Sequence, residues 1–97
     1  MDRPQRSRFE LVRGGDVLGF LDYVRTPDSV ILTHAEVRAE LRGQGFGERL
    51  ADGALRFLQD GSSRVVARCP FVVGYLRHHP EIAARLRLAD EPRLVGR

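Results

Sequence analysis

The order of three segments between residues 29 and 69 most constrains the fold of this chain. Residues 29–37 are rich in β-branched side chains, which is typical of a strand. From Gly45 onward apolar residues recur at helical spacing, which predicts an amphipathic helix of about four turns that Gly61 is well placed to end. Residues 64–69 predict a short strand, which Pro70 ends. The apolar face of the predicted helix comprises Phe46, Leu50, Ala54, Phe57 and Leu58. Strand, helix and strand in this order imply a right-handed crossover, so we expect the two strands to lie parallel.

Two further strands are predicted ahead of this unit. Residues 9–13 and 17–25 are strand-like, and Gly14 and Gly15 between them can take the positive φ angles that a tight hairpin needs. A turn signal around Pro27 then leads into 29–37. We therefore expect an α/β (α+β) fold in which a three-stranded antiparallel meander precedes the helix and a parallel fourth strand.

The rest of the chain predicts short helices and a single domain. Residues 71–79 and 80–88 are expected to be helical and separated by Pro80, which can begin a helix but interrupts one that precedes it. A chain of 97 residues is long enough for one core and too short for two. We predict a flexible lead-in over 1–7, one domain over 8–90 and a tail over 91–97.

Composition narrows the classes of function. The chain has no apolar run near the roughly 20 residues that a membrane span needs, and no apolar segment follows the N-terminal charges, so we expect a cytoplasmic protein without membrane contact. All 16 basic residues are arginine, and they are interleaved with 13 acidic ones, so the net charge of +3 does not favour nucleic acid as a partner. Cys69 is the single cysteine, which rules out an intrachain disulfide.

The most informative motif is the loop between the third strand and the helix, Arg42-Gly43-Gln44-Gly45-Phe46-Gly47. Glycines let the backbone turn sharply and approach a ligand, while the unpaired N–H groups and dipole of the helix favour an anion. The plainer alternative is a glycine-rich turn without a ligand. If a pyrophosphate binds, we expect amides around Gln44 to Gly47 to hold it and Arg42 to add a charge-assisted hydrogen bond. The loop lacks the Gly-Lys-Ser/Thr ending of an ATPase loop and does not open a βαβ dinucleotide unit, which leaves coenzyme A as the best fit.

A family resemblance supports this interpretation. The stretch 37–47, Val-Arg-Ala-Glu-Leu-Arg-Gly-Gln-Gly-Phe-Gly, resembles the acetyl-CoA-binding segment of the GNAT (GCN5-related) N-acetyltransferases. Together with Thr33-His34-Ala35-Glu36-Val37, Cys69-Pro70-Phe71 and 75–81, it resembles a short single-domain subfamily that lacks the final strands of full-length members. The resemblance covers about 9–86. It implies a minimal GNAT-like fold, acetyl-CoA as cosubstrate, and transfer of the acetyl group to an acceptor amine on a protein or a small molecule.

Four residues are candidates for the chemistry, because acetyl transfer needs a base for the amine and an acid for the departing thiolate. His34 and Glu36 share one face of the third strand with Leu32, and either could be the base. The resemblance suggests Cys69 as an acetyl acceptor and Tyr75 as the acid. The structural alternatives are a buried inert cysteine, a hydrogen-bonded histidine and a tyrosine that packs in the core.

The remaining candidates concern the coenzyme and metals. The resemblance implies that the coenzyme's pantetheine arm pairs with the backbone near Glu36 and Val37, and Arg77 or His78 could contact its phosphates, although a solvated helix end is the simpler interpretation. Adjacent histidines on a helix point about 100° apart, and no third ligand is suitably spaced, so His78 and His79 do not predict a metal site.

Two other functions compete with catalysis. The short chain lacks part of the wall that usually shapes an acceptor site, which favours a non-catalytic acyl-CoA-binding or protein-interaction module. Nucleic-acid binding is the third, disfavoured by the absence of interleaved aromatic and basic residues. We expect a monomer or a weak homodimer.

Overall fold

The computed structural model describes residues 2–88 and contains a five-stranded sheet in the order β1-β2-β3-β4-β5. Neighbouring strands are antiparallel from β1 to β4, and β4 and β5 are parallel. The predicted meander, parallel crossover and short C-terminal helices are therefore confirmed, but the last helix, predicted over 80–88, ends at Ala83, and Leu88 forms a β-bridge with Val65. The strands are β1 (Asp2–Arg3), β2 (Arg8–Arg13), β3 (Asp16–Arg25), β4 (Ser29–Val37) and β5 (Arg64–Ala67), and the helices are α1 (Phe46–Gln59), α2 (Pro70–His78) and α3 (Pro80–Ala83).

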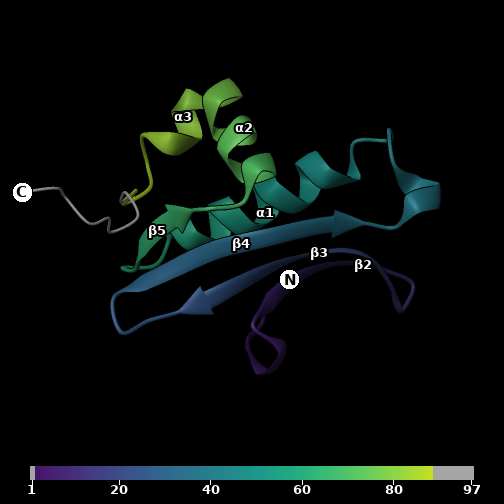
Figure 1. Ribbon diagram of the computed structural model, residues 1–97, viewed down its shortest axis with the longest axis horizontal. Coiled ribbons are helices and arrows are strands. Elements are labelled where there is room, and N and C mark those ends of the chain that lie inside the picture. The colour runs from purple at the N-terminus through teal and green to yellow at the C-terminus, as the bar shows by residue number, and fades with distance from the viewer. Residues whose placement is uncertain (1, 89–97) are drawn as a thin grey trace, which may run out of the picture.

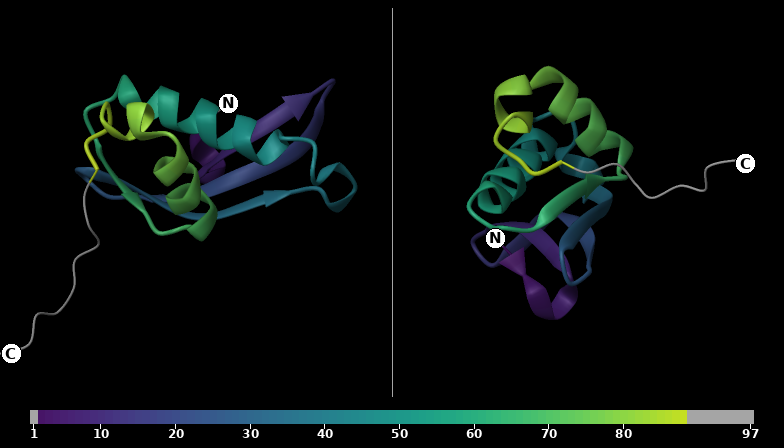
Figure 2. Two further views of the ribbon diagram at one scale, coloured as in Figure 1. Left: turned by 90° about the horizontal axis from the view of Figure 1, so that it is seen from above. Right: turned by 90° about the vertical axis from the view of Figure 1, so that its left-hand side faces the viewer.

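The core lies between one face of the sheet and α1, and α2 and α3 lie beside α1 (Figure 1, Figure 2). Leu50, Ala54, Leu55 and Leu58 of α1 are buried against apolar residues of β2, β3 and β4. Phe57 differs from its predicted place on the apolar face. It is 54% exposed and meets Phe9 edge-on at 5.7 Å between ring centroids, because Leu55 occupies the centre of the buried face instead. No α-helix within residues 2–88 is long and apolar enough to cross a membrane.

The start of the chain differs from the predicted flexible lead-in. Asp2 and Arg3 pair with β2, and a 3-10 turn (Pro4–Arg6) returns the chain to it. This turn lies on the face of the sheet opposite α1 (Figure 1). The side chain of Glu10, only 3% exposed as a residue, makes ion pairs there with Arg3, Arg6 and Arg8 at 3.3, 3.5 and 3.7 Å. Asp2 and Arg3 thus belong to the sheet, whereas residues 4–7 are exposed; the predicted tail (91–97) and residues 89 and 90 lie outside the described residues.

Candidate functional site

Strands β4 and β5 part halfway along β4. Their pairing runs only from Ser29 opposite Arg64 to Leu32 opposite Ala67. The amides of Arg68 and Cys69 both donate to the Leu32 carbonyl, at 3.0 and 2.9 Å, and the chain then turns into α2. The last part of β4, residues 33–37, extends beyond β5. An opening therefore forms between the end of β4 and the start of α2.

A β-bulge in β4 lies where β4 and β5 separate, next to Leu32. Asp22 is opposite His34 while Tyr23 is opposite Leu32, so Thr33 is the extra residue, and its hydroxyl donates to the Asp22 carbonyl at 3.2 Å. The bulge shifts the alternation of side chains along the strand. Leu32 is buried in the core, whereas His34 lies on the opposite face.

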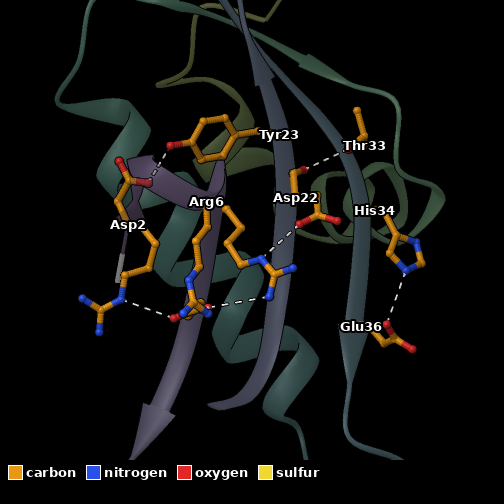
Figure 3. A network of polar contacts seen from close by, with 10 residues as sticks. Asp2, Arg6, Asp22, Tyr23, Thr33, His34 and Glu36 are labelled. Carbon is orange, nitrogen blue, oxygen red and sulfur yellow. Dashed lines mark hydrogen bonds and ion pairs between the residues drawn. The ribbon is translucent and has the colours of Figure 1, made fainter.

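The predicted arrangement of the β4 side chains is therefore wrong in one respect. His34 and Glu36 do share a face, but Leu32 lies on the other one, with Ala35 packed against the core. The two polar side chains point to the outer face of the sheet, 62% and 52% exposed, and face one another at 3.7 Å between His34 Nε2 and Glu36 Oε2 (Figure 3). Phe20 lies beside His34, with 6.1 Å between the ring centroids.

The opening contains a cleft of about 560 Å³. One wall is the end of β4, another is the glycine loop with the first turn of α1, and Phe71 of α2 closes a third side. Phe46 and Leu50 give it an apolar floor. The lining residues are 34–37, 41–43, 45–48, 50 and 71. The structure thus brings the predicted glycine loop together with His34, Glu36 and Val37, while Gln44 is exposed and is not part of the lining.

The glycines of the loop are required for different structural reasons. Gly43 and Gly45 have φ angles of 84° and 82°, which favour glycine, and Gly45 is the N-cap of α1 without a side-chain capping bond. A Cβ on Gly47 would lie 3.0 Å from Phe71 Cζ, so the aromatic ring rests directly on this glycine. The result is a helix start with accessible backbone next to the cleft.

The charges at the helix start are mixed. Arg42 lines the cleft and donates from Nε to the Val37 carbonyl at 3.4 Å, which holds its guanidinium beside the loop. Glu48, in the first turn of α1, also lines the cleft, and its negative charge opposes binding of an anion. The helix dipole and Arg42 act in the other direction.

Tyr75 and Cys69 lie away from the cleft lining. The phenol of Tyr75 donates to Asp52 Oδ1 at 3.1 Å, and burial, helped by this carboxylate, raises the pKa of Tyr75 to about 12. Its ring stacks on His79 at 4.0 Å between centroids. Cys69 is the N-cap of α2 and is 3% exposed within the core.

A second cavity, of about 410 Å³, lies on the other side of Phe71. Phe71 and Glu48 line both spaces, and Tyr75, His78 and His79 line only the second. His78 Nδ1 lies 2.9 Å from the Gly74 carbonyl, which fixes the proton on Nδ1 and leaves Nε2 as an acceptor. Arg77 is exposed at the end of α2 and lines neither space. Over residues 2–88, no group of three or more His, Cys, Asp or Glu side chains is placed to hold a metal ion.

Sequence reasoning missed Phe71 and Glu48 as site residues. Phe71 follows the helix-starting Pro70 and has Tyr75 four residues later, a spacing that suits core packing equally well. The available signal was Gly47, a glycine inside the first turn of a helix, which indicates that another group approaches closely.

Comparison with known proteins agrees with this geometry. No curated protein matches the sequence. The family model of the GCN5-related N-acetyltransferases matches residues 8–86, which is most of the chain, and the protein therefore belongs to that family.

Proposed function

We propose that this protein is an acetyl-CoA-dependent N-acetyltransferase that binds its coenzyme in the cleft where β4 leaves β5. The observation that carries the proposal is the backbone edge of β4 beyond Leu32, which β5 does not cover and where Arg42 Nε donates to the Val37 carbonyl. The Arg38 amide donates to the Leu18 carbonyl of β3 at 2.9 Å. Because the backbone N–H and C=O groups of successive strand residues point to opposite sides, those of Ala35 and Val37 point away from β3, toward the cleft. The amides of a pantetheine arm can pair with such an edge, as an added strand would.

The pyrophosphate of the coenzyme would lie at the start of α1. Amides of Gly45, Phe46 and Gly47 are the donors that a helix start offers to an anion. A guanidinium has five N–H groups, so Arg42 can keep its bond to Val37 and still bind a phosphate. We assign the rest of the nucleotide to the cavity beyond Phe71, which shares Phe71 and Glu48 with the cleft and is lined by His78.

His34 and Glu36 are the proposed acceptors of the amine proton. In the transfer the amine nitrogen attacks the thioester carbonyl carbon, the C–N bond forms and the C–S bond breaks. The proton leaves the amine to Glu36 or His34, and the coenzyme thiolate takes up a proton. Transfer through an acetyl-Cys69 intermediate requires exposure of a thiol that is 3% exposed, so the geometry favours direct transfer. The resemblance suggests Tyr75 as the thiolate acid, but its phenol donates to Asp52 and Tyr75 lines only the second cavity, so we do not assign it that role.

The test combines calorimetry of acetyl-CoA binding with intact mass spectrometry. The chain contains no lysine, so an acetyl group on a side chain cannot come from the usual lysine self-acetylation. We expect saturable binding, release of free coenzyme thiol with an amine acceptor, and no adduct on the resting protein. An adduct that Cys69→Ala abolishes would replace direct transfer by the covalent route. Binding without turnover for any acceptor would indicate an acyl-CoA-binding module, and absence of binding would refute the assignment of the cleft.

A further inference from the structure

A separate cavity of about 370 Å³ lies on the outer face of the sheet, opposite α1. Glu36 is directly opposite Phe20 in the β3–β4 register, which places both on this face, and the Arg8 guanidinium lies over the Phe20 ring at 4.1 Å from its centroid. The cavity is bounded by the start of β3, the end of β4 and the chain that follows β4. Glu36, Val37 and Arg42 line both this cavity and the cleft, so the two spaces meet around the end of β4.

Three of the four charged residues that line this cavity are arginines. Arg8, Arg38 and Arg42 line it together with a single acidic residue, Glu36, although Arg8 also makes ion pairs with Glu10 and Asp22, outside the lining, at 3.7 and 3.4 Å. Arg38 is exposed and makes an ion pair with Glu40 at 2.8 Å. Each guanidinium carries five N–H donors, so these arginines retain hydrogen-bonding capacity toward a ligand. Apolar side chains of β3, including Leu18 and Phe20, form the rest of the wall.

We propose that this cavity is the acceptor site and that the acceptor is a small amine that carries a carboxylate. This inference rests on the function proposed above. The amine of the acceptor would lie at Glu36, where the cavity meets the cleft. The carboxylate of the acceptor would bind the arginines, because a guanidinium can pair with a carboxylate through two parallel hydrogen bonds. The volume suits a molecule about the size of an amino acid.

The test compares matched amines. Glycine, β-alanine and 4-aminobutyrate are each assayed beside the corresponding amide with saturating acetyl-CoA, and rates are corrected for the fraction of free amine at the assay pH. For at least one pair, we expect the kcat/KM of the carboxylate-bearing amine to be about tenfold or more higher than that of its amide. A charge-assisted hydrogen bond in a partly enclosed site accounts for a difference of this size.

Arg38→Gln should remove most of this preference by raising the KM for the carboxylate more than the KM for the matched amide. Arg25→Gln is the matched control, because Arg25 lies at the far end of β3, opposite Val30, and lines neither cavity. Equal rates for carboxylates and amides, equal effects of the two substitutions, or transfer to neither class while acetyl-CoA still binds would each overturn the acceptor site. Failure of acetyl-CoA to bind would instead refute the proposed function, and the acceptor site with it.

Discussion

The glycine loop can be tested by a pair of substitutions that strain the backbone equally. Gly43 in the loop has φ 84°, and Gly15 in the β2–β3 turn has φ 86°. A Cβ built on either glycine has no atom within 4 Å, so alanine causes no collision at either position. The remaining effect on stability is the cost of holding a side chain at positive φ, about 1–2 kcal/mol. Alanine also restricts the unfolded chain, which offsets this cost by about 0.4–1 kcal/mol. Where the folded protein retains this strain, the substitution should lower the free energy of unfolding by up to about 1.5 kcal/mol.

Coenzyme binding should separate the two variants. In Gly43→Ala the loop can relieve its strain in the free protein by leaving φ 84°, and binding must then restore that conformation. The cost is at most the strain itself, so the Kd for acetyl-CoA should rise by about 5- to 30-fold. Gly15→Ala should bind as the wild type does. Calorimetry measures the Kd, and urea unfolding shows whether the two variants are equally destabilised.

Two results would refute this reasoning. If Gly43→Ala keeps both the stability and the acetyl-CoA affinity of the wild type, the strain appears neither in folding nor in binding, and the loop does not hold the coenzyme in the conformation described. If both variants lose affinity equally, the loss reflects general destabilisation and not the loop.

Three further changes probe the sheet, the core and the helix contact. Gly19→Ala should destabilise by about 1–3 kcal/mol in urea unfolding, because its Cβ would lie 2.8 Å from the backbone oxygen of Glu36; unchanged stability would contradict this packing of β3 on β4. Leu55→Ala, at a fully buried position, should cost about 2–5 kcal/mol without changing the m-value, and a loss below about 1 kcal/mol would argue against its central place in the core. The folded-state pKa of Tyr75, about 12, lies above the ordinary 10.0, so its contribution to stability is present below pH 10 and is lost as the pH rises toward about 12. Tyr75→Phe should flatten the dependence of stability on pH in that window, and an identical slope in the variant would exclude titration of Tyr75 as its cause.

Much of the fold could be predicted because its signals are local. The hairpin glycines, the β-branched strand 29–37 and the helical spacing after Gly45 each lie within one element, and the crossover rule joins them. The N-terminal turn could not be predicted in this way. Asp2 and Arg3 form a strand only because ion pairs with Glu10 and a hydrogen bond from Tyr23 to Asp2 hold the segment, and these contacts join residues that no sequence period connects.

Some parts of the candidate site could likewise be predicted from local sequence, and others depend on how the elements pair and pack. The loop and the β4 candidates are neighbours in sequence, so their proximity followed from the order of elements. The orientation of His34 and Glu36 relative to Leu32 depends on where β4 gains a residue relative to β3, which is a property of pairing and not of composition. The position of Phe71 over Gly47 depends likewise on how α2 packs against α1.

The bulge at Thr33 connects the two proposed halves of the site. Without it, strict alternation would place His34 and Glu36 on the face that carries Leu32, under the helices, where burial disfavours charged side chains. With the extra residue, the core receives Ala35 and the outer face receives the two ionisable groups. The backbone edge of the same residues is free because β5 ends its pairing at Leu32. A coenzyme bound to the edge of β4 and an acceptor bound on its outer face would then meet at Glu36, which is the one ionisable group of β4 that lines both cavities.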